Sequence, residues 1–288
     1  MKTEQWIANF NTVNTRDAAK KSLIAWNKYL VDQKINETTL IKKIILDGAD
    51  LRYDELANFV NEYSSVSPVQ PASIRQYYHF IRSYFRAVHG IKTYTEDAKI
   101  FIKPPSIVKV SRVPLTREKI KILCQNADLV HKASYLVLAS SGMRMSEFLS
   151  CTPENYNFKS DPIMVSISGK KTKTKTERIT FISHEASAAI RKAGREFWLQ
   201  RSLLNEESAF SRVRKRAGFI EKYTDSVNYF VNLHSFRAFF RTNAGKINQD
   251  FAESLLGHGG YLTQYVRLSP EELGSNYKKL EPKLRIWE

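Results

Sequence analysis

Hydrophobic residues recur at helical spacing through most of the first hundred positions. One stripe repeats at intervals of four, three and four residues and so occupies one helical face: Ala19, Leu23, Trp26 and Leu30. A longer stripe shares one face of a second helix: Ile74, Tyr77, Tyr78, Ile81, Tyr84, Phe85 and Val88. Gly90 is placed to end that helix as a left-handed cap, and weaker helical patterns cover residues 37–46 and 53–63. These patterns predict a helical N-terminal domain.

The stretch KPPSIVKVSRVP breaks this periodicity. It contains prolines and basic residues with neither a helical nor a strand period, which is typical of a semi-extended linker. A chain of 288 residues also exceeds what one hydrophobic core usually organises. We therefore expect a helical domain over residues 1–102, a linker over 103–114 and a second domain over 115–288.

The second domain combines helical patterns with one short β region. Thr116 is placed to cap a helix that runs to Cys124, and a helix over residues 132–139 is expected to break at Ser140-Ser141-Gly142. Alternating apolar residues over 163–167, followed by a lysine-rich turn and residues 179–182, predict a β-hairpin. The remaining helical patterns cover residues 183–198, 206–217, 235–244, 248–256 and a last helix that begins at Ser269-Pro270. The expected fold class is mainly α, with a small antiparallel sheet in a mostly helical C-terminal domain.

The net charge of the chain indicates which class of partner it binds. The chain has 45 Lys and Arg against 29 Asp and Glu, which gives a formal net charge of +16 and favours a polyanion as the partner. No apolar run approaches the roughly 20 residues of a membrane span, so nucleic acid is favoured over lipid. Cys124 and Cys151 have no second Cys or His at metal spacing, and we interpret both as reduced core residues. Since MKTEQWIANF lacks the regions of a signal peptide, we expect a cytoplasmic protein.

Two segments each contain an arginine that is placed to bind a phosphate. In Gly142-Met-Arg144-Met-Ser-Glu147, an arginine follows a helix break and a carboxylate stands three residues later to fix its guanidinium. His234 and Arg237 are also three residues apart, so they project from one side of a helix, and the planar fork of arginine suits two phosphate oxygens. Taken alone, each segment is better explained as an ordinary side-chain pair on a helix surface.

Further basic and polar residues are compatible with DNA contact. His258 follows a helix end among glycines that allow close backbone approach, although a C-capping histidine also fits this pattern. The lysine-rich turn offers either one lysine to the reacting phosphate or a solvated basic surface: Lys170, Lys171, Lys173 and Lys175. Arg75, Arg82 and Arg86 lie off the apolar face of their helix, where they either meet phosphates or face water.

Together, these segments resemble the tyrosine recombinase family, also called the phage-integrase family. The G-x-R-x-S-E, H-x-x-R and L-G-H elements occur in the family's order and at comparable separations. The resemblance implies that Arg144 and Arg237 hold the scissile phosphate and that Glu147 supports the first arginine. It also implies that His234 and His258 hydrogen-bond or shuttle protons and that a hairpin lysine is the general acid. We choose Lys173 because it lies near the middle of the turn.

At the nucleophile, the spacing in this sequence departs from that of the family. Relatives commonly carry it about nine residues beyond the L-G-H histidine, whereas Tyr265 is seven residues beyond His258. Tyr265 follows Thr263-Gln264, which echoes the family, and is our choice. Tyr277 is the alternative, particularly if the terminal segment is donated to a neighbouring protomer.

The family resemblance also implies the reaction and its partners. It implies DNA cleavage and rejoining through a 3′-phosphotyrosine, with no metal and no other cofactor, by a tetramer assembled on double-stranded DNA. The predicted function is a site-specific DNA recombinase of the integrase type; the alternatives are a Xer-like dimer resolvase and a noncatalytic DNA-binding regulator on the same scaffold. The apolar residues of the segment 269–288 are expected to pack either on a neighbouring protomer or on their own domain.

Overall fold

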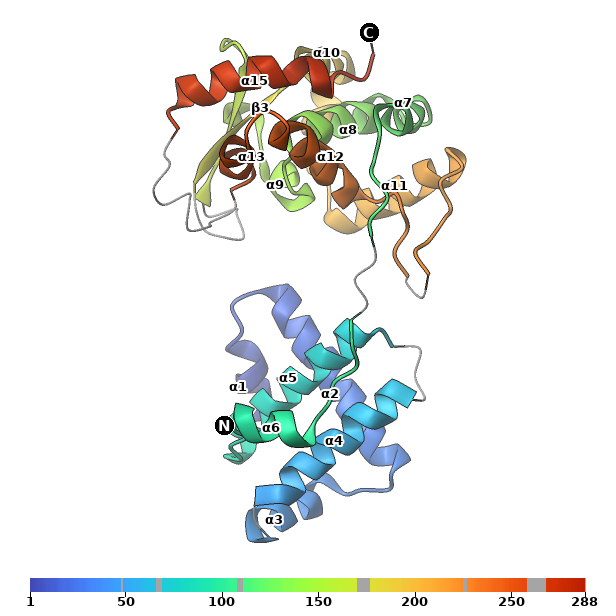
Figure 1. The fold of residues 1–288 in the computed structure, drawn as a ribbon, viewed down its shortest axis with the longest axis vertical. Helices are drawn as coiled ribbons and strands as arrows, with labels where there is room; N and C mark the ends of the chain where they lie inside the picture. Colours follow the sequence, from blue (N-terminus) through green and yellow to red (C-terminus); the bar gives the residue numbers. More distant parts are fainter. Residues whose placement is uncertain are drawn as a thin grey trace. The chain divides into compact units, whose positions relative to one another are not determined.

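The computed structural model describes residues 1–47, 49–65, 69–107, 111–169, 177–224, 227–257 and 268–287. The chain divides into two compact units, residues 1–109 and 110–288, and each has its own hydrophobic core (Figure 1). The division falls within residues 103–114, the stretch that the sequence assigns to a linker. The predicted fold class, mainly helical with a small antiparallel sheet, is confirmed.

The first unit is built from helices. Their bounds are α1 (Thr3–Ala8), α2 (Val13–Asp32), α3 (Glu37–Asp47), α4 (Ala49–Ser65), α5 (Pro71–His89) and α6 (Thr95–Phe101). Helix α5 packs against α1, α2 and α4. Gly90 follows α5 as the predicted left-handed cap, with φ of 72°.

Aromatic packing fixes the centre of this unit. Trp26 is fully buried, and the rings of Tyr29, Phe59 and Phe85 lie 5.3–5.4 Å from its own. Such ring pairs contribute about 0.5–1.5 kcal/mol each beyond the area they bury. The apolar stripes predicted on α2 and α5 therefore meet in one core.

The second unit contains the sheet. Strands β1 (Tyr156–Asn157), β2 (Ile163–Ile167) and β3 (Arg178–Ile182) pair antiparallel in the order β1-β2-β3. In the β2–β3 pair, Val165 lies opposite Thr180. This arrangement confirms the predicted hairpin and adds the short strand β1 at its edge.

Helices make up most of the rest of the second unit. Their bounds are α7 (Arg117–Gln125), α8 (Leu129–Ser141), α9 (Met145–Ser150), α10 (His184–Ala193), α11 (Leu203–Arg216), α12 (Leu233–Gly245), α13 (Gln249–Leu256) and α15 (Pro270–Leu284), with short 3₁₀ helices η1 (Pro153–Asn155) and η3 (Gly194–Trp198). Helix α8 is the central element, because it packs against α7, α10, α12 and β3. Thr116 caps α7 as predicted.

The predicted break of α8 was placed slightly too early. Ser140 and Ser141 remain helical because their hydroxyls donate to the carbonyls of Leu136 and Val137, which removes the competition that serine usually offers to a helix. The helix ends at Gly142, which adopts the left-handed conformation at φ of 64°. The next helix, α9, begins three residues later, at Met145.

Helix α15 covers its own unit. Ser269 caps it and Pro270 occupies its first position, as predicted. Its buried face packs against α8, α12, α13 and β3 (Figure 1): Leu273, Tyr277, Leu280 and Leu284. Of the two placements considered for this segment, the structure therefore has the one on its own domain.

Candidate active site

Glu147 is the centre of a buried polar cluster. It lies in the first turn of α9, and its side chain is 1% exposed. Its carboxylate accepts hydrogen bonds from the backbone N–H of Arg144 at 2.8 Å and from Nη1 of the same arginine at 2.7 Å. The helix break at Gly142 thus turns the chain so that Glu147 holds the Arg144 guanidinium as expected.

Arg178 is a second partner of this carboxylate. Its Nη2 donates to Oε2 of Glu147 at 2.6 Å, and its Nη1 donates to the carbonyl of Leu255 at the end of α13. The side chain is 5% exposed. Arg178 was assigned no role in the sequence analysis. The available signal was its phase in the strand, since Arg178 shares the buried face of β3 with Thr180 and Ile182.

Arg237 completes the cluster from α12. Its two terminal nitrogens donate to the carbonyls of Gly142 at 2.6 Å and Leu256 at 2.7 Å. Its Nη1 is 4.0 Å from Oε2 of Glu147. The helix therefore places a buried guanidinium between the ends of α8 and α13.

The cluster carries more positive than negative charge. Burial alone would raise the pKa of the Glu147 carboxyl, but the charge of Arg178 and hydrogen bonds from Arg144 and Arg178 outweigh burial and lower that pKa. Burial, with the neighbouring charges of Arg144 and Arg178, lowers the pKa of Arg237 to about 10, so Arg237 stays cationic at neutral pH. Three guanidinium groups thus surround one carboxylate, and an anion is the natural ligand of the remaining charge.

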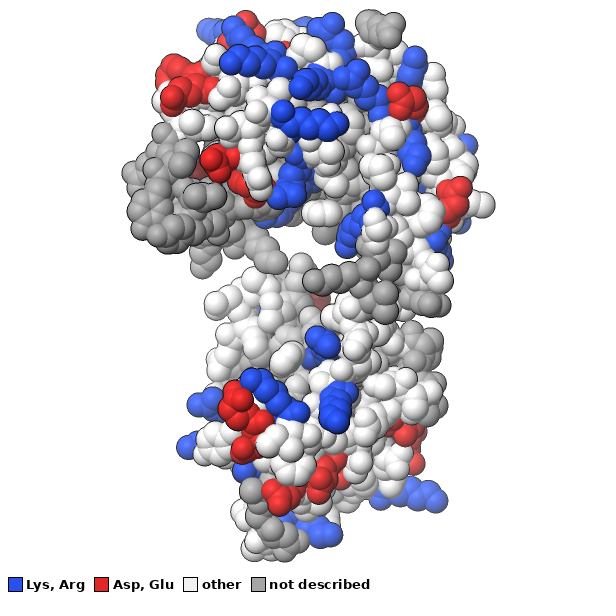
Figure 2. Space-filling model, viewed as in Figure 1, with Lys and Arg blue, Asp and Glu red and all other residues white. Residues whose placement is uncertain are grey.

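Basic side chains extend well beyond the cluster. On the face seen in Figure 2, Lys and Arg outnumber Asp and Glu in the second unit, notably over α7 and α15. A surface of this kind attracts a polyanion over a distance of about one Debye length, roughly 8–10 Å at physiological salt.

The structure brings together three of the predicted site residues, Arg144, Glu147 and Arg237. His234 is exposed in the first turn of α12, three residues before Arg237. The other predicted site residues of the second unit lie outside the described residues: Lys170, Lys171, Lys173, Lys175, His258 and Tyr265.

Tyr277 is part of the hydrophobic core of the second unit. It is fully buried, its hydroxyl donates to the carbonyl of Ser140 at 2.7 Å, and its ring lies 5.2 Å from that of Phe181. Burial raises the pKa of the Tyr277 hydroxyl well above its ordinary value of 10. A nucleophile must reach a DNA phosphate and lose its proton, so this position argues against Tyr277 as the alternative nucleophile.

Two of the three arginines singled out on α5 have partners within the first unit. Arg75 Nε donates to the carbonyl of Pro105 at 3.0 Å, and Arg82 donates to the Thr93 hydroxyl and carbonyl, both at 2.9 Å. Arg86 is exposed.

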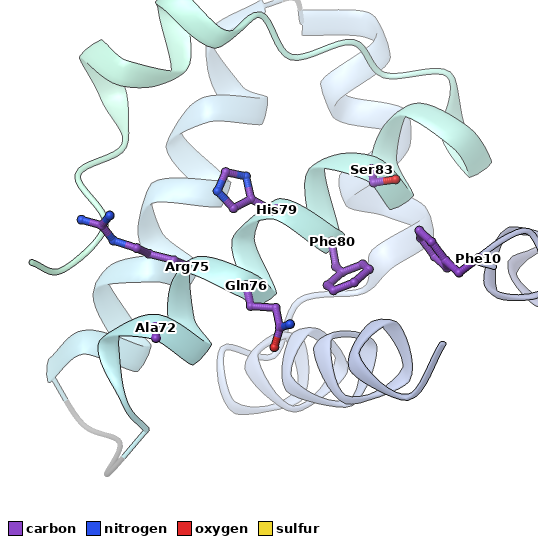
Figure 3. Close-up of a pocket in the computed structure, with 7 residues that line it drawn as sticks. All are labelled: Phe10, Ala72, Arg75, Gln76, His79, Phe80 and Ser83. Atoms are coloured by element: carbon purple, nitrogen blue, oxygen red, sulfur yellow. The ribbon is translucent and has the colours of Figure 1, made fainter. Parts of the chain in front are cut away.

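The same helix, α5, borders a hollow of about 400 Å³ that the sequence analysis did not predict (Figure 3). Gln76 and His79 are its exposed polar residues, and Phe10 and Phe80 lie beside them.

Two further features bear on the kind of site. Among the residues that the structure describes, no group of three or more His, Cys, Asp or Glu side chains is placed to hold a metal ion. Within the same ranges, no helix is both long and apolar enough to cross a membrane.

Two known proteins that resemble this chain are tyrosine recombinases. No family model matches the chain. The tyrosine recombinase XerD of Pasteurella multocida (strain Pm70) is 26% identical over 306 residues, which cover 97% of this chain and 96% of that protein. The chain is thus similar to a tyrosine recombinase over nearly its whole length. The tyrosine recombinase XerC of Histophilus somni (strain 2336) is 29% identical over 176 residues, 55% of this chain and 56% of the relative.

Solved structures of tyrosine recombinases and integrases share the fold. XerH site-specific recombinase bound to its difH substrate has a TM-score of 0.58 and 14% identity, covering 90% of this chain and 78% of XerH. A lambda integrase dimer bound to a COC′ core site has a TM-score of 0.56 and 16% identity, covering 94% of this chain and all of that chain. Both helical units and the small sheet therefore follow a tyrosine recombinase architecture.

Proposed function

We propose that this chain is a site-specific DNA recombinase of the integrase type. It cleaves and rejoins double-stranded DNA through a 3′-phosphotyrosine intermediate. The observation that supports this function best is the buried cluster of Arg144, Arg178 and Arg237 around the single carboxylate of Glu147. The XerD relative and the DNA complexes of XerH and lambda integrase point to the same substrate.

Arg144 and Arg237 supply the charge that this reaction needs. A phosphodiester resists attack because its anionic oxygens repel a nucleophile, and the pentacoordinate transition state carries still more negative charge. Preorganised guanidinium groups in a site with little water stabilise that charge, and losing one such donor typically costs about 10²–10³ in rate. Glu147 keeps the Arg144 guanidinium in place while the charge develops.

Tyr265 is the proposed nucleophile. Its oxygen attacks the scissile phosphorus, a P–O bond to tyrosine forms, and the P–O bond to the 5′ oxygen breaks. Lys173 donates the proton that the leaving 5′ oxygen takes up, while His234 and His258 hydrogen-bond the phosphate or carry the tyrosine proton away. The products are a 3′-phosphotyrosine and a free 5′-hydroxyl.

The covalent link retains the energy of the phosphodiester. A 5′-hydroxyl from another strand reverses the attack and reseals DNA without ATP, so two duplexes held together exchange strands. We infer that four protomers assemble on DNA to hold those duplexes and that no metal or other cofactor takes part.

The first unit contributes a DNA-binding surface along α5. This helix contains three arginines, two histidines and no acidic residue. Gln76 and His79 are both exposed on this helix (Figure 3). Partial desolvation of the His79 ring, together with the charges of Arg82 and Arg75, lowers its pKa from the ordinary 6.5, so the ring is neutral at pH 7. Gln76 suits adenine in the major groove, and Arg86 suits a phosphate. Arg75 and Arg82 instead support the unit, and the hairpin lysines 170, 171 and 175 add phosphate contacts in the second unit.

A suicide substrate tests the proposal. A recognised sequence is selected from a randomised duplex pool by retention on the protein and is then synthesised with a nick near its centre, so that the cleaved fragment diffuses away. We expect a covalent protein–DNA adduct on a denaturing gel, in the presence of EDTA and without ATP. Selected DNA that binds but gives no adduct would favour the noncatalytic regulator.

Two tyrosine substitutions identify the nucleophile. Tyr265→Phe should abolish the adduct, because it removes the attacking oxygen while leaving the ring. Tyr277→Phe should keep the adduct and lower stability by about 1 kcal/mol, the usual net value of a hydrogen bond. The opposite result for the adduct would assign the reaction to Tyr277.

A Xer-like dimer resolvase is the second candidate, because both named relatives carry Xer names. The two functions differ in the DNA that they join. A resolvase converts a plasmid carrying two directly repeated copies of the selected site into two circles. An integrase joins two DNA molecules that carry different partner sites.

A further inference from the structure

We propose that Arg178 is a positioning residue of the phosphate-binding cluster. It engages the Glu147 carboxylate so that Glu147 aligns Arg144 without accepting a direct hydrogen bond from Arg237. The proposal rests on the proposed function for the identity of the anion, a DNA phosphate. In this role, Arg178 leaves the positive charge of Arg237 available to bind an anion.

The geometry at the carboxylate supports this role. Oε1 of Glu147 accepts from Nη1 of Arg144 at 2.7 Å. Oε2 accepts from the Arg144 backbone N–H at 2.8 Å and from Arg178 Nη2 at 2.6 Å. Arg237 Nη1 approaches the same oxygen only to 4.0 Å, which is beyond hydrogen-bonding distance. Arg178 thus fills a hydrogen-bonding position on Oε2 of Glu147, and the guanidinium of Arg237 lies close to that oxygen.

Two neutral carbonyl groups accept hydrogen bonds from Arg237. The hydrogen bonds to the carbonyls of Gly142 and Leu256 fix its guanidinium without cancelling its charge. A direct bond to a carboxylate would also orient the guanidinium but would neutralise it. Because its acceptors are carbonyl groups, Arg237 keeps the positive charge that it needs to bind an anion.

Arg178 also holds the end of α13. It donates to the carbonyl of Leu255, and Arg237 donates to the next carbonyl, that of Leu256. A helix C-terminus carries partial negative charge and favours cations. The segment that contains the predicted His258 and Tyr265 starts directly after this point, so Arg178 links Glu147 to the base of that segment.

The alternative is a purely structural salt bridge. A buried arginine that pairs with a buried carboxylate stabilises the fold whether or not an anion binds nearby, and removing it leaves an unpaired charge. Both explanations predict that Arg178→Gln lowers the melting temperature. They differ in anion affinity, and especially in the effect of removing the Glu147 charge as well.

The first experiment uses inorganic sulfate as the probe and the full chain. Sulfate affinity is measured from the rise in melting temperature with sulfate concentration at constant ionic strength. Wild type should bind sulfate, and Arg178→Gln should weaken binding about tenfold, because Arg237 then pairs with Glu147 and the cluster loses one charge. In Arg178→Gln/Glu147→Gln the carboxylate charge is gone, so affinity should return to within about threefold of wild type.

Two further variants control for folding. Arg178→Lys keeps the positive charge, and its sulfate affinity should stay close to wild type. Arg201→Gln removes the nearer of two basic partners of another buried carboxylate, Glu206, which is 2% exposed and lies 3.1 Å from Arg201 and 3.8 Å from His131. That variant should lose melting temperature yet keep wild-type sulfate affinity.

The second experiment measures the rate of adduct formation on the nicked duplex at saturating DNA. Arg178→Gln should be at least tenfold slower than wild type, Arg178→Lys intermediate and Arg201→Gln equal to wild type. If wild type forms no adduct, the proposed function fails, while the sulfate series still tests Arg178. Wild-type sulfate affinity in Arg178→Gln, or weaker binding in the double variant than in the single one, would overturn the role of Arg178.

Discussion

Glu147 contributes to stability in a manner that depends on pH. The pKa of its carboxyl is lowered from the ordinary 4.5, so the carboxylate stabilises the fold above that value and this contribution is lost as pH falls through the lowered pKa. Glu147→Gln should therefore unfold more easily at pH 7, by about 3–5 kcal/mol, because Arg178 is left buried without its counter-charge. Urea unfolding of both proteins at pH 7 and in steps down to about pH 3 measures the difference, which should shrink at low pH. An equal difference across that range would mean that the carboxylate charge is not the cause.

Gly257 has a steric requirement besides its backbone conformation. Its φ is 63°, and a Cβ at this position would lie 2.5 Å from Cδ of the buried Arg178 side chain. Gly257→Ala therefore has to displace Arg178 as well as adopt a left-handed conformation. Overpacking of this kind usually costs about 1–3 kcal/mol, in addition to about 1–2 kcal/mol for the conformation.

Gly218→Ala is the matched control for this prediction. Gly218 is in the same unit with φ of 78°, but nothing lies within 4 Å of its added Cβ. Its substitution should cost only the conformational part and leave adduct formation unchanged. Gly257→Ala should lower both stability and adduct formation. Equal unfolding free energies for the two variants would show that Arg178 accommodates the methyl group.

The candidate site was only partly predictable from residue patterns. Arg144, Glu147 and Arg237 were found because each lies in a short motif whose spacing puts two side chains on one helical face. Arg178 was missed because its role arises from β3 meeting α9 and α13, which no local pattern records. Tyr277 remained an alternative for the same reason, since its burial depends on α15 packing over α8 and β3.

At the scale of elements, periodicity predicted the long helices and the hairpin. The amphipathic stripe of α5 was found in full because its buried residues repeat without interruption. The short helices α1 and α6 were not separately predicted, because six or seven residues give too few turns for a period to register. The end of α8 was misplaced by two residues, since the sequence does not reveal that Ser140 and Ser141 bond back to their own helix.

The arginines of α5 should separate into structural and DNA-contacting residues. Arg82 bonds to Thr93 in the loop after the helix, so Arg82→Ala should lower the stability of the first unit by about 1–3 kcal/mol. Arg86 is exposed, so Arg86→Ala should leave stability nearly unchanged and weaken DNA binding. Removing the cation that neutralises one phosphate makes the slope of log affinity against log salt shallower by about 0.9.

The measurements are thermal unfolding and binding of the selected duplex over a series of salt concentrations. Arg86→Ala should reduce the salt slope by about one, whereas Arg82→Ala should leave the slope unchanged at temperatures where the protein is folded. If Arg82→Ala reduced the slope and kept full stability, then the sequence-based assignment of Arg82 to DNA would hold instead.

At the scale of the whole molecule, composition and the order of the motifs indicated the function more strongly than any single residue did. A net charge of +16 indicated a polyanion, and the sequence of G-x-R-x-S-E, H-x-x-R and L-G-H indicated the family. Neither required knowledge of packing. The two separate cores, in contrast, were inferred from length and one proline-bearing stretch, and their members are known only from the structure.

The two cores predict that the units fold and bind separately. No residue is shared between the two hydrophobic clusters, so fragments 1–109 and 110–288 should each unfold cooperatively in urea. Joining two DNA-binding units by a short tether makes the second contact intramolecular, which typically raises affinity by about 10²–10⁴ over either unit alone. Because counterion release is additive, the salt slope of the intact chain should equal the sum of the two fragment slopes. If fragment 110–288 alone matched the affinity and slope of the intact chain, the first unit would have no part in binding DNA.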